Sequence, residues 1–212
     1  AGGGVGDIMG LFAFRGAPGR PILSPSRRQG GSLAFLPRQF KTNPDPPMKH
    51  LLTLDDWSPE DIAASVKLAA DIKARPAAYA DAMSRKVLFM VFEKPSLRTR
   101  VSFETGMARM GGYAINYDTS TSPLGAGKES LEDTIRVVSR YADLIVARLY
   151  KHTDIDKMAA NSSVPVINGL TDLAHPCQIL ADLLTLNEKK GGLQGRTLCY
   201  LGDSNNNVTH SL

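Results

Sequence analysis

Hydroxyl and guanidinium side chains gather in the segment Ser96-Leu97-Arg98-Thr99-Arg100, directly after an apolar run. If a helix begins here, its first backbone N–H groups have no partner inside the helix, and the helix dipole places positive potential around them. Hydroxyl groups and a planar guanidinium in such a first turn complete a binding site for phosphate. The alternative is an ordinary helix cap at Ser96 with solvated arginines. Of the two, the residue pattern favours anion binding.

Three more polar side chains are expected beside the ends of buried strands. Arg148 closes the predicted strand 143–148, and His175 and Gln178 flank the start of a predicted helix at Pro176. A guanidinium or an imidazole can donate a hydrogen bond to a developing oxyanion, and an amide offers both a donor and an acceptor. Taken singly, Arg148 fits an exposed strand end equally well, and a histidine at a helix start is more often structural.

A fourth polar segment, residues 202–211, carries three consecutive asparagines, Asn205, Asn206 and Asn207, after a predicted strand. It lacks the G-x-G-x-x-G spacing with which dinucleotide-binding proteins cradle a pyrophosphate. Taken alone, this segment says little about a ligand.

The elements that position these side chains alternate along the chain. Strands that alternate with helices at this spacing indicate an α/β protein with a doubly wound, mainly parallel sheet and helices on both faces. Because such sheets bind ligands beyond the carboxyl ends of their strands, we expect the functional residues just after the first, third and fourth strands. Strands are expected at 86–92, 113–117, 143–148, 164–168 and 197–201, and helices at 59–74, 98–110, 130–141, 154–160 and 176–188.

The chain divides into three parts by composition and pattern. Residues 1–47 are expected to form a disordered leader, residues 48–190 an α/β domain, and residues 191–212 the start of a second α/β domain. The third part follows from the predicted strand 197–201. A lone strand cannot bury its two faces, so this strand requires further elements beyond the end of the chain.

The leader carries the basic excess of the chain. The formal net charge is +4, but residues 1–44 hold six Lys or Arg side chains against one acid, and the rest of the chain holds one more acid than base. A nearly neutral domain has no electrostatic footprint for nucleic acid. A basic, acid-poor leader rich in Gly, Pro and Ser is typical of a transit peptide, which predicts the mitochondrial matrix or, alternatively, a plastid. The remaining alternative is a tail without an address.

The bulk composition is that of a soluble globular protein, with 42% hydrophobic and 22% charged residues. No stretch approaches about 18 consecutive apolar residues, so no membrane span is predicted. Cys177 and Cys199 do not have the spacing of a disulfide framework, and we expect two free thiols.

Two of the polar segments together resemble the motifs of one family, the aspartate/ornithine carbamoyltransferases. The family's Ser-x-Arg-Thr-Arg motif matches residues 96–100, and its His-Pro-x-Gln motif matches residues 175–178. The resemblance extends from about Lys49 to the end of the chain. Three details resemble the ornithine branch more than the aspartate branch: Lys94, the stretch 179–185, and the pair Asn206-Asn207.

The resemblance implies a carbamoyl transfer that needs neither metal nor cofactor. The neutral δ-amine of ornithine attacks the carbamoyl carbon of carbamoyl phosphate, an oxyanion forms, and phosphate leaves to give citrulline. The implied catalytic groups are Arg98, Arg148 and His175. The implied contacts are Ser96, Leu97 through its backbone, Arg98 and Thr99 with the phosphate, Arg148, His175 and Thr99 with the carbamoyl oxygen, Gln178 with the carbamoyl amide, and Asn207 with ornithine.

The resemblance also implies a homotrimer formed through the domain 48–190. Within the family, the alternatives to ornithine are aspartate and N-acylated ornithine. Outside catalysis, the alternative is a fragment that binds carbamoyl phosphate or joins trimers without turnover. The family's Ser-Met-Gly and His-Cys-Leu-Pro segments, which hold ornithine and assist its attack, do not occur in this sequence, so the chain by itself is expected to be inactive. Many members also have a Gln where Ser122-Pro123 stand, which leaves one phosphate contact open.

Overall fold

A parallel four-stranded sheet forms the centre of the protein. The computed structural model describes residues 49–119, 124 and 127–212. The strand order is β2-β1-β3-β4, and every pairing between neighbours is parallel. The predicted α/β class with a parallel sheet is therefore confirmed. The strands are β1 (Val87–Phe92), β2 (Tyr113–Asp118), β3 (Leu144–Arg148) and β4 (Val166–Leu170).

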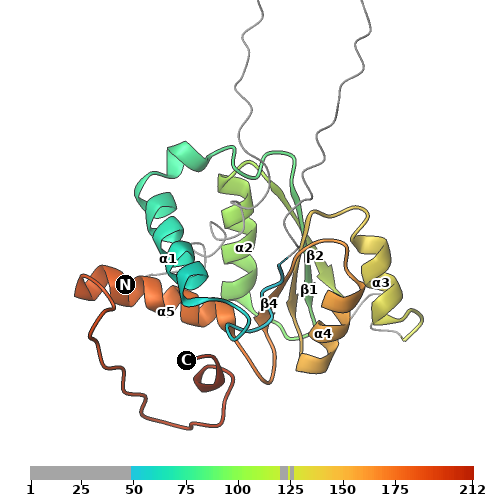
Figure 1. The fold of residues 1–212 in the computed structure, drawn as a ribbon. Coiled ribbons are helices and arrows are strands. Elements are labelled where there is room, and N and C mark those ends of the chain that lie inside the picture. The colour runs from blue at the N-terminus through green and yellow to red at the C-terminus, as the bar shows by residue number, and fades with distance from the viewer. Residues whose placement is uncertain (1–48, 120–123, 125–126) are drawn as a thin grey trace, which may run out of the picture.

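Helices cover both faces of the sheet (Figure 1), with α1, α2 and α5 on one side and α3 and α4 on the other. The side chains of β1 alternate between two apolar clusters, because successive residues of a strand point to opposite faces. Met90 packs with Phe103 of α2, whereas Val91 packs with Ile155 of α4. The helices are α1 (Pro59–Ala74), η4 (Pro76–Tyr79), α2 (Leu97–Arg109), α3 (Leu131–Val138), α4 (His152–Asn161), α5 (Pro176–Lys190) and η6 (Thr209–Ser211).

Serine caps fix the starts of three helices. The hydroxyl of Ser58 accepts a hydrogen bond from the third residue of α1 at 3.1 Å, and Ser130 does the same for α3 at 3.1 Å. Ser96 caps α2 in the same manner, accepting from the Thr99 N–H at 3.4 Å. Each cap satisfies one N–H that the helix leaves unpaired. The predicted starts of these helices are confirmed to within one residue.

The strand order places a switch point between β1 and β3. From β1 the chain crosses to β2 at one edge and then returns to β3 on the other side of β1. The loops after β1 and β3 therefore leave the sheet in opposite directions, which opens a crevice at their carboxyl ends. The last residues of the two strands, Phe92 and Arg148, are register partners at this crevice.

The predicted boundaries that differ from the structure by two residues or more are the start and end of β4, the end of α3, the start of α4 and the end of α5. Strand β4 begins at Val166 and not at 164, because the Ser162 hydroxyl accepts from the Val164 N–H in a local turn and Pro165 has no N–H to donate. Helix α3 ends at Val138, because residues 140 and 141 donate in i to i−3 turns. Helix α4 starts earlier than predicted, at His152.

The predicted strand 197–201 is wrong. Residues 197–201 are exposed and form no strand, and the described part of the chain offers no neighbouring strand for a hydrogen-bond ladder. After α5 the segment loops away from the sheet, and its last residues return as the single turn η6 (Figure 1). The predicted second domain is not tested by this segment.

Some predictions concern residues that the structure does not describe. The leader 1–47 and the pair Ser122-Pro123 lie outside the described residues.

Cys177 and Cys199 are both free thiols, as predicted. None of the described helices is long and apolar enough to cross a membrane.

Candidate functional site

The first turn of α2 has the form of an anion-binding site. Its donors are the hydroxyl groups of Ser96 and Thr99 and the backbone N–H groups of the turn, and we call it the α2 cup. The Ser96 hydroxyl donates to the Thr99 hydroxyl at 3.0 Å and accepts from the Thr99 N–H, so the two hydroxyl groups are held side by side at the helix start. Thr99 is buried, while Leu97 is 78% exposed. Neighbouring backbone N–H groups of this turn have no partner inside the helix and carry the positive end of its dipole. The segment therefore presents hydroxyl and N–H donors to a bound anion.

Arg148 joins this cup from the end of β3. Its Nη1 donates to the Thr99 Oγ1 at 3.5 Å, and its Nε is buried without a hydrogen-bond partner among the described residues. Burial, followed by the charge of Arg98, lowers the pKa of the Arg148 guanidinium. In the described part of the chain, neither arginine forms an ion pair with a carboxylate. A partly buried cation without a counter-ion is costly, and a bound anion would remove that cost.

His175 reaches the same place from the loop after β4. The residue is buried, and its Nδ1 has no hydrogen-bond partner among residues 49–119, 124 and 127–212. Burial, followed by the charge of Arg148, lowers the pKa of the His175 imidazole to about 4. At neutral pH the ring is therefore uncharged, with one N–H that can donate to an oxygen atom.

Two other predicted site residues are held by protein contacts. The side-chain amide of Gln178 donates to Asp182 on the next turn of α5 at 3.0 Å, which leaves its second N–H and its carbonyl oxygen for a ligand. The side-chain amide of Asn207 donates to the Thr171 carbonyl at 2.8 Å, which places it against the loop that carries His175. The predicted contacts of Gln178 with a carbamoyl amide and of Asn207 with ornithine stay predictions.

The second arginine of the motif points elsewhere. Arg100 forms an ion pair with Glu104 at 2.9 Å, one turn along α2. It lines a hollow of about 260 Å³ on the β2 side of the helix start, together with Ser96, Asn116 and Asp118. Arg148 and His175 do not line this hollow, whereas Ser96 does.

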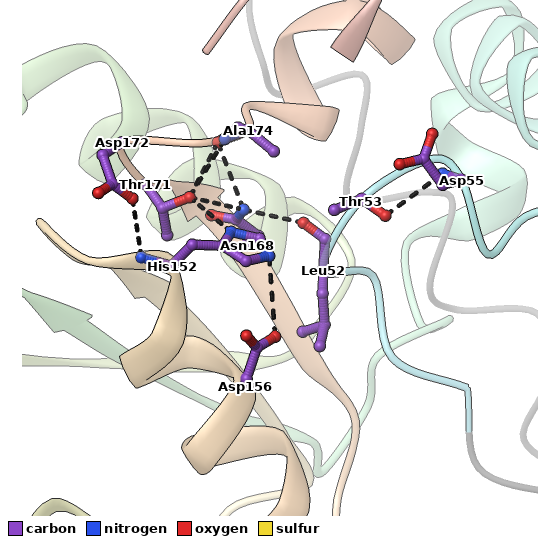
Figure 2. A network of polar contacts seen from close by, with 9 residues as sticks. All are labelled: Leu52, Thr53, Asp55, His152, Asp156, Asn168, Thr171, Asp172 and Ala174. Carbon is purple, nitrogen blue, oxygen red and sulfur yellow. Dashed lines mark hydrogen bonds and ion pairs between the residues drawn. The ribbon is translucent and has the colours of Figure 1, made fainter. Parts of the chain in front are cut away.

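Sequence reasoning missed a buried polar network in the loop that precedes His175, around Thr171 and Ala174 (Figure 2). Asn168 and Thr171 are both 0% exposed, and the imidazole of His152 contacts the Thr171 hydroxyl. An asparagine in an apolar strand, followed by a threonine, was a signal for such a network. The partner His152 is the first residue of α4, and its sequence position gave no indication of the contact.

The described residues contain no group of three or more His, Cys, Asp or Glu side chains that could hold a metal ion.

Residues 49–188 match the model of a protein family described as "Aspartate/ornithine carbamoyltransferase, carbamoyl-P binding domain". That range covers more than half of the chain. The chain belongs to the aspartate/ornithine carbamoyltransferase family.

Relatives within this family match most of the described part of the chain. An ornithine carbamoyltransferase from Listeria monocytogenes serotype 4a is 46% identical over 164 residues, which is 77% of this chain and 51% of the relative. The solved ornithine carbamoyltransferase from Pyrococcus furiosus is 45% identical with a TM-score of 0.73, covering 77% of this chain and 52% of that one. A variant of N-acetyl-L-ornithine transcarbamylase, solved with carbamyl phosphate and N-succinyl-L-norvaline, is 34% identical with a TM-score of 0.64. The match covers 70% of this chain and 50% of that one. This chain thus spans about half the length of these relatives.

Proposed function

We propose that this chain is the carbamoyl-phosphate-binding part of an ornithine carbamoyltransferase, which transfers the carbamoyl group to the δ-amine of L-ornithine and yields L-citrulline and phosphate. The observation that carries the proposal is the meeting of the α2 cup with Arg148, which has no counter-ion in the described part of the chain, and with an uncharged His175. A small dianion with a polar carbonyl group suits these three features together.

Each part of the site has a distinct task in this reaction. The α2 first turn and Arg98 hold the phosphate group, whose negative charge increases as it leaves. Arg148 and His175 donate to the carbamoyl oxygen, on which negative charge develops when the amine attacks. Donors fixed in advance in a partly buried site stabilise such an oxyanion strongly, and losing one costs about 3–4 kcal/mol.

The nature of the amino-acid substrate rests on sequence and on the named relatives. Lys94 and the pair Asn206-Asn207 resemble the ornithine branch, and the relatives from Listeria and Pyrococcus are named ornithine carbamoyltransferases. The structural likeness to an N-acetyl-L-ornithine transcarbamylase supports an N-acylated ornithine as the second candidate. Aspartate is the third.

Titration calorimetry of the 212-residue chain tests the ligand. We expect carbamoyl phosphate to bind more tightly than inorganic phosphate, because only the former reaches both the cup and the Arg148–His175 pair. Arg98→Met should weaken both ligands. Arg100→Met is the matched control, since its ion pair with Glu104 lies outside the proposed contacts, and both affinities should stay within about twofold. Equal binding of the two ligands to the unaltered chain, or no binding, would contradict the proposal.

A citrulline assay separates catalysis from binding alone. With ornithine and carbamoyl phosphate, we expect the chain by itself to form no citrulline, because the family's Ser-Met-Gly and His-Cys-Leu-Pro segments do not occur in it. Citrulline formation by this chain would contradict that expectation. Formation of N-acylated citrulline from N-acylated ornithine, with no citrulline from ornithine, would contradict the same expectation and select the second candidate.

We also propose a homotrimer and a mitochondrial address for the protein, with a plastid as the alternative. Exposed apolar side chains on neighbouring elements, Val101 on α2 and Tyr113 and Ile115 on β2, support an association surface in the domain. The acid-poor composition of residues 1–44 supports the address. Light scattering after gel filtration tests the trimer, and the destination of a fluorescent protein fused to residues 1–47 tests the address.

A further inference from the structure

The loop that follows Arg148 and the loop that carries His175 are joined by hydrogen bonds. The Leu149 N–H donates to the Leu170 carbonyl at 2.9 Å, and the Asp172 N–H donates to the Tyr150 carbonyl at 3.0 Å. At the start of α4, the His152 N–H donates to the Asp172 carboxylate at 2.8 Å. The loop after β3 and the loop after β4 therefore cannot move independently.

The peptide group between Ala174 and His175 is held at both ends. Its carbonyl accepts from the Thr171 N–H at 3.0 Å and from the Asn168 side-chain amide at 3.3 Å. Its N–H donates to the Ser211 hydroxyl at 2.9 Å. Because this peptide group directly precedes the His175 Cα, its orientation sets where the imidazole points.

The Thr171 hydroxyl is the centre of this arrangement (Figure 2). It accepts from the Ala174 N–H at 3.2 Å and lies 2.8 Å from His152 Nδ1. The hydroxyl oxygen also accepts from the Asn168 side-chain amide at 3.4 Å, which occupies its second lone pair. The alternative acceptor for the hydroxyl proton is the Ala174 carbonyl at 3.4 Å, which already receives two hydrogen bonds. The single hydroxyl proton is therefore directed to His152 Nδ1. The ring proton of His152 then resides on Nε2, which faces Asp156 at 3.7 Å.

The order Asp156–His152–Thr171 has the appearance of a hydrolase triad, but burial excludes that role. Thr171 is 0% exposed, so its hydroxyl cannot reach a substrate. The side chain of His152 is 13% exposed, at the outer edge of the network. The chemistry left for this chain of hydrogen bonds is to hold the turn 171–174 in place.

We propose that His152 is a positioning residue. By accepting a hydrogen bond from the Thr171 hydroxyl, it fixes the turn 171–174 and so holds His175 facing Arg148. What His175 then does rests on the proposed function. The positioning itself rests on the hydrogen bonds alone and has its own test.

Nuclear magnetic resonance titration of the His175 ring is the first test. His152→Leu removes the acceptor, loosens the turn and admits water, so the pKa of His175 should rise from about 4 toward its ordinary value. His152→Asn keeps an acceptor near the position of Nδ1 and should preserve the low pKa. Asp154→Asn, which breaks an ion pair with Lys157 on the same helical turn, is the matched control and should change nothing. An unchanged His175 titration in His152→Leu overturns the proposal.

Ligand preference is the second test. In His152→Leu, the preference for carbamoyl phosphate over inorganic phosphate should fall by about tenfold, as for the loss of one well-placed hydrogen bond. Affinity for inorganic phosphate should persist, because the α2 cup is untouched. An equal loss for both ligands would signify general unfolding and would overturn the proposal. If the unaltered chain shows no preference, the proposed function fails, while the His175 titration still decides the positioning role.

Discussion

Arg148 and His175 owe their properties to the same burial. An arginine partly withdrawn from water without a counter-ion destabilises the ligand-free protein, and a histidine beside it is kept uncharged. These properties lower the stability of the ligand-free protein and favour the binding of an anion. Groups whose pKa is shifted by burial and by a neighbouring charge cluster at functional sites.

Replacing Arg148 tests this conflict between stability and binding. Arg148→Met fills a similar volume without a charge, and we expect the ligand-free chain to gain about 1 kcal/mol in free energy of unfolding. The same variant should lose the preference for carbamoyl phosphate. Urea unfolding and calorimetry provide the two readings. A destabilised Arg148→Met protein would show that the guanidinium has a partner that compensates its burial.

The low pKa of His175 predicts a pH dependence of stability. Because the folded pKa of about 4 lies below the ordinary 6.5, the unfolded chain binds more protons between these values. Stability is therefore fully present above about pH 6.5 and decreases as the pH falls toward 4, by up to about 3 kcal/mol for this group.

His175→Gln isolates that contribution from those of the carboxylates. Stability of the unaltered chain and of the variant should be measured by urea unfolding at several pH values. We expect the free energy of unfolding of the unaltered chain, minus that of the variant, to decrease as the pH falls from 6.5 to 4. A difference that stays constant over this range contradicts a buried, uncharged His175.

At the scale of elements, caps and apolar runs made most of the fold predictable. Ser58, Ser96 and Ser130 cap the helices that their positions indicated, and the apolar run of β1 is buried on both faces. These features depend on neighbours in sequence. The predicted site residues Ser96, Thr99, Arg148 and His175 lie close together because the strand order brings their loops to one crevice.

What sequence could not provide depends on partners far along the chain. The segment 197–201 has the composition of a strand, but a strand needs a neighbour, and the described residues offer none. The contact of His152, at the start of α4, with Thr171, after β4, joins residues 19 positions apart and follows no local pattern. The side-chain hydrogen bond from Gln178 to Asp182 is an i to i+4 contact within α5 that sequence reasoning did not predict.

The three serine caps allow a matched comparison within one protein. Ser96→Ala, Ser58→Ala and Ser130→Ala should each lower the free energy of unfolding by about 1 kcal/mol, because each removes one helix cap. Only Ser96→Ala should also weaken binding of carbamoyl phosphate, since only α2 begins at the cup. Unfolding and calorimetry on all three variants check this. Equal affinity in the three would remove Ser96 from the phosphate site.

On the scale of the whole molecule, the sheet with its two apolar layers is separate from the segment after α5. Asn207 and Ser211 contact the loop that carries His175, but residues 194–205 are exposed. A chain that ends at Lys190 should therefore fold cooperatively and lose about 1–3 kcal/mol, equivalent to a few hydrogen bonds. Thermal unfolding measures this. A truncated chain without a cooperative transition would show that the last segment is part of the folding unit.

A crystal structure of the chain with carbamoyl phosphate tests the central claim most directly. We predict that the phosphate group lies at the start of α2 within hydrogen-bond distance of Ser96 and Thr99, with the carbamoyl oxygen facing Arg148 and His175. A ligand bound in the hollow beside Asn116 and Asp118, with Arg148 and His175 free of it, would contradict the account.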